Sequence, residues 1–403
     1  MIQLGCNESL PIGWKWVEAG SVIDVRDGTH DSPKPVEKGI PLVTSKNLKN
    51  GLIDFSTCSF ISEEDHVAIS KRSAVENGDI LYAMIGTIGN PVLVNTTQSF
   101  SIKNVALFKF GASKVHNRYF YHYLNSSLVD QQFSKNARGG TQRFVSLGNI
   151  RKLQIPLPPF DEQKRIAAIL DKADAIRQKR KQAIALADDF LRSIFLDMFG
   201  DPVTNPKGWE EPILKNISDI RSGVTKGKKI PEGKGVTLPY MRVANVQDGY
   251  LDLTSIQEIT VTEKDAEKCR LYKGDILLTE GGDPDKLGRG HVWNEEVKDC
   301  IHQNHIFSVR VKDQEFVRPE FLSSVLSSQR GKRYFLKVGK QTTGIATINK
   351  TVLSEFSPIV PPIEIQDKYL EIVRRMREIQ SSDSYKDSRL FESLSQKAFS
   401  GQL

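Results

Sequence analysis

The chain has few cysteines, and it has no long apolar run. Its four cysteines include no C-x-x-C pair, so the spacing typical of a structural zinc site or a disulfide framework is missing. No window approaches the roughly 18 apolar residues of a membrane span, and the N-terminus lacks the basic and apolar segments of a signal peptide. We therefore expect a cytoplasmic protein with reduced thiols and no membrane partner.

Neither sign of charge dominates the composition. The 56 lysines and arginines exceed the 49 acidic residues by seven, a modest excess that suits a polyanionic partner without proving one. Hydrophobic residues at 39% and charged residues at 26% lie near the average of soluble globular proteins. These values exclude collagen-like and wholly disordered chains. The length of 403 residues suggests two or three domains.

Motifs for nucleotide chemistry are also missing. The segment from Gly223 to Lys229 lacks the ending of a G-x-x-x-x-G-K-[ST] phosphate loop, which excludes an ATP-driven motor of that type. An Asn-Pro-Pro-Tyr type pocket, expected of an adenine methyltransferase, is not found, and Asn205-Pro206-Lys207 indicates only a linker turn. We therefore predict no catalytic residue on this chain.

Two weaker patterns leave alternatives open. Pro284-Asp285 with Glu296-Val297-Lys298 loosely matches a spacing in which two carboxylates hold Mg²⁺ and a lysine positions water. A stand-alone Mg²⁺-dependent nuclease is therefore one alternative, although Gly281 to Asp285 is typical of a turn between strands. His302 and His305 indicate a strand and its edge rather than a metal site. A scaffold that binds only protein is a further alternative.

An internal repeat organises the whole chain. Short landmarks recur in the same order about 200 residues later, and the slow change in offset indicates small loop insertions. Glycines and prolines among them have backbone-specific roles, so chance matches are a poor explanation. The matches are Gly13-Trp14 with Gly208-Trp209, Pro41, Asn47, Gly51 and Asp54 with Pro239, Asn245, Gly249 and Asp252, Gly78-Asp79-Ile80-Leu81 with Gly274-Asp275-Ile276-Leu277, Asn104 with Asn304, and Pro158-Pro159 and Gln163 with Pro361-Pro362 and Gln366.

Each copy predicts a globular part of mixed α/β structure. Short apolar runs bounded by turn residues indicate strands at Ile80 to Ile85, Ala106 to Phe110, Ile276 to Leu278 and Ile306 to Val309. Helical spacing of apolar residues follows at Tyr119 to Leu128 and at Pro319 to Ser328.

A long helix is predicted after the Pro-Pro of each copy, because a helix can begin only beyond a residue that precedes proline. No glycine or proline interrupts Glu162 to Phe199, and its apolar residues recur at heptad spacing. The second helix covers about Glu364 to Phe399, and both are most polar at their centres. An antiparallel pairing would match polar centre with polar centre over roughly 55 Å.

The segments around these helices resemble the specificity subunits of type I restriction-modification systems. The resemblance rests on Pro156-Leu157-Pro158-Pro159 with Glu162-Gln163 and Ile166-Ala167, on Phe195 to Pro202, and on Leu390 to Leu403. It implies α+β (mixed α/β) domains that recognise DNA, separated by two long antiparallel coiled-coil helices. The implied boundaries are 1–157 and 201–360 for two target-recognition domains, and 158–200 and 361–403 for the conserved helical regions.

The resemblance also implies a non-catalytic subunit and its partners. Each target-recognition domain would read one half of a bipartite, asymmetric site in double-stranded DNA, and the helices would set the spacing. Two methyltransferase subunits would dock on the helices, and motor-nuclease subunits would join through them. S-adenosylmethionine, ATP and Mg²⁺ would be bound by those partners, so we expect no cofactor and no metal on this chain.

Residue type and position in loops indicate the candidate DNA contacts. Base edges are read by Arg, Lys, Asn and Gln, and phosphates are held by Lys, Arg, Ser and Thr. Asn47 and Asn245 could equally cap a turn. The DNA-binding candidates are Thr29, His30, Lys34, Lys46, Asn47, Arg138, Thr141, Gln142 and Arg143 in the first copy, and Lys226, Lys228, Lys229, Arg242, Asn245, Lys340, Gln341, Thr342 and Thr343 in the second. The candidates for subunit docking are Ile169, Ile176, Phe190, Ile194, Met198, Val373, Met376, Leu390 and Leu394.

Overall fold

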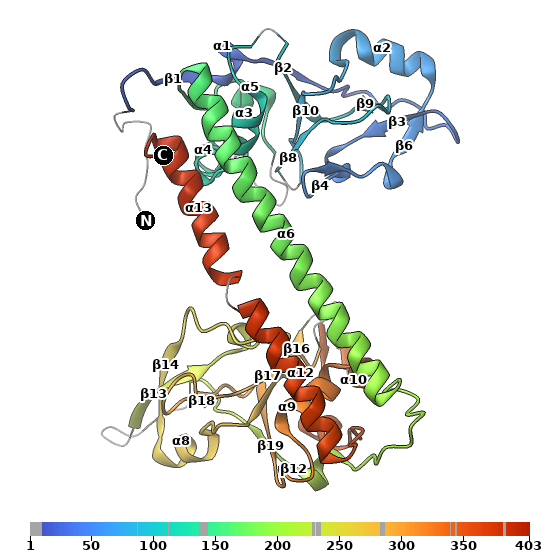
Figure 1. The fold of residues 1–403 in the computed structure, drawn as a ribbon, viewed down its shortest axis with the longest axis vertical. Coiled ribbons are helices and arrows are strands. Elements are labelled where there is room, and N and C mark those ends of the chain that lie inside the picture. Colours follow the sequence, from blue (N-terminus) through green and yellow to red (C-terminus); the bar gives the residue numbers. More distant parts are fainter. Residues whose placement is uncertain are drawn as a thin grey trace. The chain divides into compact units, whose positions relative to one another are not determined.

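The structure, a computed structural model, consists of two compact units. Unit 1 contains Met1–Ala183 and Asp383–Leu403, and unit 2 contains Ile184–Ser382. The described residues are 10–86, 88–111, 113–136, 144–227, 230, 235–282, 287–338, 340–342, 345–381 and 384–403. Figure 1 shows the order of the elements along the chain.

Unit 1 is built around a four-stranded antiparallel sheet. Its order is β2 (Asp24–Asp27), β10 (Val105–Lys109), β7 (Ile80–Ala83) and β8 (Gly89–Leu93). Every residue of β7 is buried, as expected of a short apolar run between turn residues. A second sheet pairs β3 (Ile40–Val43) antiparallel with β6 (Ser59–Ile61) and parallel with β9 (Ser101–Ile102). The strands predicted for the first copy are confirmed by β7 and β10.

Helices and smaller elements cover these sheets. The aromatic helix α3 (Asn117–Leu124) packs Phe120 on Phe108 of β10, with ring centroids 4.9 Å apart. The other elements are β1 (Lys15–Glu18) paired with β11 (Gln154–Leu157), the hairpin of β4 (Leu48–Lys49) and β5 (Leu52–Ile53), α1 (Ala19–Val22), η1 (Ser45–Asn47), η2 (Phe55–Thr57), α2 (Glu63–Ser73), α4 (Ser127–Asn136) and α5 (Leu147–Arg151).

Unit 2 repeats this plan. Its four-stranded sheet has the order β12 (Ser218–Ser222), β19 (Ile306–Val311), β15 (Ile276–Thr279) and β17 (Gly290–Val292). Its second sheet pairs β13 (Gly235–Met241) antiparallel with β14 (Gln257–Thr262) and parallel with β18 (Ile301–His302). The remaining elements before the C-terminal helices are α7 (Leu214–Ile217), η3 (Val243–Asn245), α8 (Glu263–Cys269), β16 (Gly281–Gly282), α9 (Pro319–Ser327), α10 (Gln329–Val338), β20 (Lys340–Thr342), β21 (Ile345–Thr347) and α11 (Lys350–Ser354). The repeat predicted from the sequence is therefore present in the fold.

A buried ion pair explains the repeated Gly-Asp-Ile landmark. Asp79 accepts a hydrogen bond from Lys109 Nζ at 2.8 Å, and Asp275 accepts from Arg310 Nε at 2.6 Å. Both aspartates are almost fully buried, and each also accepts a backbone N–H three residues earlier. A glycine with positive φ precedes each of them, at 89° and 91°. The landmark thus encodes a turn that brings a carboxylate under the sheet.

The long helix is confirmed as α6 (Phe160–Phe199), whose residues belong to unit 1 as far as Ala183. The second predicted helix is found as α12 (Ile363–Ser381) and α13 (Ser384–Ser400), and residues 382–383 lie outside the described part. In unit 1, α13 runs antiparallel to α6. Arg165, near the start of α6, donates to the carbonyl oxygen of Leu403 at 2.9 Å, and Arg177, farther along α6, lies over the ring of Phe391, 4.4 Å from its centroid.

Each core is closed by two helices from different places in the sequence. In unit 1, Phe399 of α13 is 1% exposed and its ring lies 5.5 Å from Tyr119 and 5.2 Å from Tyr123. In unit 2, Phe199 of α6 lies 4.9 Å from Phe321 and 5.3 Å from Tyr369 of α12. In unit 2, the end of α6 therefore packs beside the start of α12, and in unit 1 the end of α13 packs on α3.

Candidate nucleic-acid interface

A close crossing of two strands positions the first candidate loop of each unit. A Cβ on Gly28 would lie 2.2 Å from the carbonyl oxygen of Ile102, and one on Gly223 would lie 2.0 Å from that of His302. Only glycine allows this approach. The next residue in each unit then forms a parallel bridge, Thr29 with Lys103 and Val224 with Gln303. The loops that follow therefore leave the two units at equivalent places.

In unit 1 this loop forms one wall of a cleft of about 790 Å³. Lys34 and Lys46, two of the DNA-contact candidates, are exposed at the cleft, and Lys103 is half-buried with its Nζ 2.5 Å from Ser32 Oγ. Three cationic side chains on one concave surface attract phosphate oxygens. The lining residues are Ser32, Pro33, Lys34, Pro35, Leu42, Thr44, Ser45, Lys46, Ser59, Ile85, Gly86, Lys103 and Asn104.

His30 is hydrogen-bonded to Asn104, a residue that lines this cleft. Its Nδ1 lies 3.1 Å from Asn104 Oδ1 and its Nε2 lies 2.8 Å from Asp27 Oδ2. These hydrogen bonds, to Asn104 first and to Asp27 second, raise the pKa of His30. Asp27 also pairs with Arg72, so its carboxylate is fixed from two sides. The exposed His30 ring is thus held in one orientation beside Thr29, whose Oγ1 accepts the Asp31 N–H at 3.1 Å.

The two equivalent asparagines are turn caps in both units. Asn47 Oδ1 accepts the backbone N–H three residues earlier at 2.9 Å, and its Nδ2 donates to the carbonyl oxygen seven residues later at 3.2 Å. The matching distances for Asn245 are 2.9 and 2.8 Å. Each residue is 3% exposed. Of the two roles left open by the sequence, capping describes both, and the exposed Lys46 is the side chain that the turn presents.

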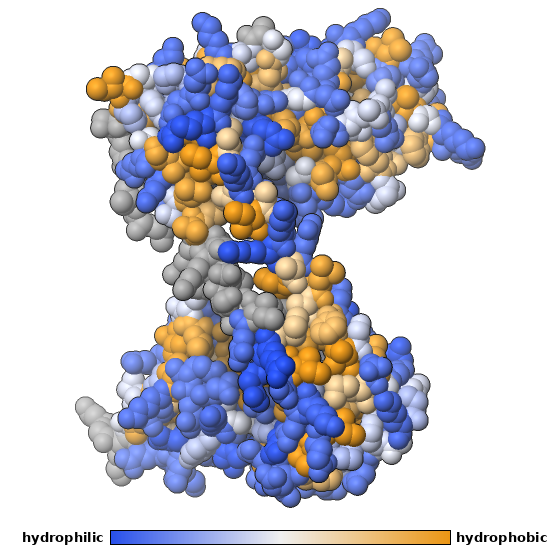
Figure 2. Space-filling view, in the orientation of Figure 1, coloured by the Kyte–Doolittle hydropathy of each residue, from blue (hydrophilic) through white to orange (hydrophobic). Residues whose placement is uncertain are grey.

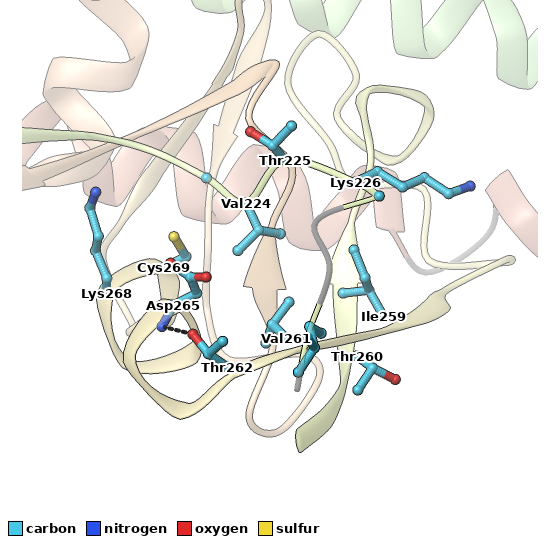
Figure 3. A pocket seen from close by; sticks show the side chains of 13 residues that line it. Val224, Thr225, Lys226, Ile259, Thr260, Val261, Thr262, Asp265, Lys268 and Cys269 are labelled. Carbon is cyan, nitrogen blue, oxygen red and sulfur yellow. Dashed lines mark hydrogen bonds between the residues drawn. The ribbon is translucent and has the colours of Figure 1, made fainter. Parts of the chain in front are cut away.

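In unit 2 the equivalent loop borders a smaller pocket of about 430 Å³ (Figure 3). Val224 and Val261 point toward each other across it, and α8 closes one side with Thr262 Oγ1 accepting the Asp265 N–H at 3.1 Å. Lys226 is exposed and extends away from the pocket. Arg242 donates to the carbonyl oxygen of Ser255 at 2.9 Å, so its guanidinium lies against its own turn.

The remaining DNA-binding candidates lie outside the described residues or in a strand of which only the backbone is described. Arg138, Thr141, Gln142, Arg143, Lys228, Lys229 and Thr343 lie outside the described residues, and of Lys340, Gln341 and Thr342 only the backbone, in β20, is described. The flanks of the two Gly-rich loops are nevertheless equivalent. Val145 N–H donates to Met84 O at 3.0 Å, and Ile348 N–H donates to Glu280 O at 2.8 Å. In each unit, the chain just after the Gly-rich loop therefore pairs with the residue that directly follows β7 or β15.

Two residues of the unit 1 cleft were missed by sequence reasoning. Lys103 and Asn104 lie in the turn between β9 and β10, and Asn104 has a positive φ of 54°. Asn104 was recognised only as a landmark of the repeat, although a repeated Asn at a turn is also a residue that tolerates this conformation. Lys103 gave no separate signal, because a single lysine is usually a solvated surface charge.

The patterns weighed for catalysis give no site among the described residues. Asp285 lies outside them, and Glu296 accepts the Asn294 N–H at 3.0 Å in an exposed loop. His302 lies in β18, as predicted, with its Nδ1 3.0 Å from Cys269 O. In the described part of the chain, no three His, Cys, Asp or Glu side chains are grouped so that they could hold a metal. None of the described helices combines the length and apolarity needed to cross a bilayer.

The predicted docking residues divide into exposed and packed side chains. In unit 1, Ile176 and Leu390 are 53% and 65% exposed and border a groove of about 190 Å³ between α6 and α13. In unit 2, Phe190 is 48% exposed, and Figure 2 shows apolar surface along the C-terminal part of α6, where Leu186 and Leu196 are also exposed. Ile194, Met198, Val373 and Leu394 instead pack on the cores of their own units, and Ile169 and Met376 are half-buried.

Comparisons with known proteins agree with this architecture. Residues 11–186 and 206–382 each match the model of the type I restriction modification DNA specificity domain. The chain is 22% identical to the type I restriction enzyme EcoKI specificity subunit of Escherichia coli K12, over 98% of this chain and 90% of that protein. It is 24% identical to the EcoBI specificity subunit of Escherichia coli, over 100% and 89%.

A solved structure shares the fold over almost the full length. The crystal structure of the type I restriction-modification system S subunit from M. genitalium matches with a TM-score of 0.56 and 16% identity, over 99% of this chain and 98% of that one. The family model covers both copies of the repeat, which together form most of the chain. The chain therefore belongs to the type I restriction-modification DNA specificity family, and it is the specificity subunit, the non-catalytic part of such a system.

Proposed function

We propose that each unit reads one half of a bipartite, asymmetric DNA site. The observation that carries this proposal is that the two units share one scaffold but present different side chains on it. Lys46 stands beside the capping Asn47, whereas Ala244 stands beside Asn245, and Lys103 corresponds to Gln303. Because base edges are read by side chains at fixed backbone positions, equal scaffolds with unequal side chains favour two different half-sites.

The loops that we assign to DNA are those positioned equivalently in both units. They comprise Thr29 to Lys34 with Lys46, and Lys226 with the turn at Arg242. The two Gly-rich loops, with Arg138 and Arg143 in one and Lys340 to Thr343 in the other, belong to the same proposal. Asn47 and Asn245 cap the turns that carry Lys46 and Arg242. The domain boundaries remain 1–157, 158–200, 201–360 and 361–403.

The helices are proposed to separate the two readers and to bind the partners. Exposed apolar side chains on a helix mark a surface that a partner covers, and Ile176, Phe190 and Leu390 are of this kind. One methyltransferase subunit per copy of the repeat gives two in all, with motor-nuclease subunits joining through them. S-adenosylmethionine, ATP and Mg²⁺ would be bound by those subunits. The assembly would act in the cytoplasm.

A map of modified bases tests the function directly. Deleting the gene for this chain should remove methyladenine from one bipartite motif of the host genome and from no other, because the methyltransferase would lose the subunit that recognises its DNA sequence. The map would also give both half-sites and their separation. Restoring the gene should restore the motif. An unchanged map in a host whose methyltransferase is shown to be active would contradict the proposal.

Alanine at Lys34 or Lys46 should weaken DNA binding in a salt-dependent way. Each lysine that neutralises a phosphate contributes about 0.9 to the slope of log K against log salt, so each substitution should reduce the slope by about that amount. Affinity is measured by fluorescence anisotropy at several salt concentrations, with the chain in complex with its methyltransferase. Lys71→Ala is the matched control, because Lys71 is an exposed lysine on α2 that does not line the cleft. A slope that is equal in all four proteins would remove the cleft from the interface.

A further inference from the structure

A buried glutamine ties the start of α6 to the recognition part of unit 1. Gln163 is 1% exposed. Its Oε1 accepts the backbone N–H of His116, the residue before α3, at 2.8 Å. Its Nε2 donates to Lys114 O at 3.2 Å and to Pro158 O at 2.9 Å. One side chain therefore joins three backbone positions, two before the aromatic helix α3 and one before α6.

The same arrangement is built again in unit 2. Gln366 is fully buried, and its Oε1 accepts the Arg318 N–H, just before α9, at 2.9 Å. Its Nε2 donates to Phe316 O at 3.1 Å and to Pro361 O at 2.7 Å. The atoms, the partners and the helices joined are equivalent in the two copies. We name these two glutamines and their three backbone partners the glutamine joints.

The glutamine joints form angle-dependent hydrogen bonds, whereas most of the surrounding contacts are non-directional apolar packing. Around Gln163, Ile166, Ala167 and Leu170 of α6 are buried in the same core as Tyr119 of α3. Burial of apolar surface is non-directional, whereas a hydrogen bond weakens steeply when its angle changes. Ion pairs also cross this boundary, Arg118 with Asp171 and Arg318 with Asp367, but their side chains are 25–52% exposed, so salt screens them in part. In unit 1, Nε2 of the buried His122 on α3 also lies 2.9 Å from Asp171 Oδ1, so this pair adds a second directional contact to that of Gln163.

We propose that Gln163 and Gln366 are positioning residues that set the angle between each recognition domain and its helix, and thereby the separation of half-sites that the protein accepts. This inference rests on the proposed bipartite function. One base pair added to the spacer moves a half-site by about 3.4 Å and rotates it by about 35°, since a turn of 34–36 Å holds 10–10.5 base pairs. With its hydrogen bonds, a joint holds the recognition domain at one angle, so DNA with the altered spacer binds poorly. Without them, the angle can change and the altered spacer is tolerated.

The substitution Gln163→Met keeps the length of the side chain and removes all three hydrogen bonds. It leaves the His116 N–H and two carbonyl oxygens without this partner, so the segment before α3 must shift to find others. We expect half-site sequences to stay unchanged and the preference for the native spacer over one base pair more or less to fall about tenfold, because the backbone groups left without this partner no longer fix one angle between α3 and α6. Gln366→Met should act in the same way from unit 2.

The test uses the full chain co-expressed with the methyltransferase of its own system. Methylated sites across the genome are sorted by spacer length, and affinities are then measured on duplexes with spacers one base pair shorter, native and one base pair longer. Gln178→Met is the matched control, because Gln178 is exposed on the same helix. Gln163→Glu keeps the shape of the side chain, but its buried carboxyl group can donate at most one hydrogen bond, and only when protonated, so it provides a second variant if Gln163→Met does not fold.

The outcomes separate this inference from the function on which it rests. If the wild-type chain shows no bipartite motif, the proposed function itself fails. If the wild type discriminates spacers and folded Gln163 and Gln366 variants do so equally well, the joints do not set the separation. An equal loss of affinity for all spacers would also overturn the inference, because it would show a general structural role. Methylation spreading to neighbouring spacer lengths with the same half-sites is the supporting result.

Discussion

Replacing Phe399 with alanine should lower the free energy of unfolding of unit 1 by about 3–5 kcal/mol, the usual cost of removing a fully buried phenylalanine. The ring is 1% exposed and contacts Tyr119 and Tyr123, so a cavity would open between α13 and α3. Hydrogen exchange followed by mass spectrometry measures the effect by unit. Peptides from β10 and α3 should lose protection, whereas peptides from β15 and β19 of unit 2 should keep theirs.

The matched control for this prediction is Leu390→Ala on the same helix. Leu390 is 65% exposed, so its substitution should change stability by no more than about 0.5 kcal/mol. If Phe399→Ala were as mild as the control, the C-terminal helix would not be part of the unit 1 core. The expected result also means that α13 stabilises the first recognition domain, although Phe399 lies 399 − 119 = 280 positions after Tyr119 in the sequence.

Unit 2 should lose stability as the pH falls from about 6.5 toward 4. Burial lowers the pKa of His291 to about 4, with the positive charge of Arg377 adding to the effect, and burial lowers the pKa of His302 to about 4. Between pH 6.5 and 4, these two histidines are therefore protonated in the unfolded chain but neutral in the folded unit. The free energy of unfolding has its full value above pH 6.5 and decreases as the pH falls through this window. Each histidine contributes up to about 3 kcal/mol.

Urea unfolding at pH 7, 6, 5 and 4.5, read by hydrogen exchange in β15 and β17, measures this loss. His302→Gln should make the decrease in stability between pH 6.5 and 4.5 shallower, because glutamine does not titrate and only one of the two buried histidines remains. His291→Gln should do the same independently. Equal stability of wild-type unit 2 at pH 7 and pH 5 would contradict the prediction.

Several parts of the fold could be predicted because they depend on local patterns. The heptad spacing and the lack of glycine and proline predicted α6 to within two residues of its start. The repeated Gly-Asp-Ile predicted equivalent strands, and the structure adds the reason, a buried ion pair from Asp79 to Lys109 and from Asp275 to Arg310. The residues of the candidate DNA interface were harder to predict from the sequence, because a loop lysine carries no periodicity that distinguishes it from other surface lysines.

The duplication, the mixed α/β class of each copy, the long helices and the family can be predicted from the order of residues along the chain. They depend on spacing, which periodicity and backbone-specific residues record. Three other features become visible only in the folded chain: Asn47 and Asn245 are turn caps, Lys103 joins Lys34 and Lys46 in one cleft, and Phe399 completes the core of unit 1. Burial, hydrogen-bond partners and clefts are made by residues far apart in sequence, and local spacing does not record their contacts.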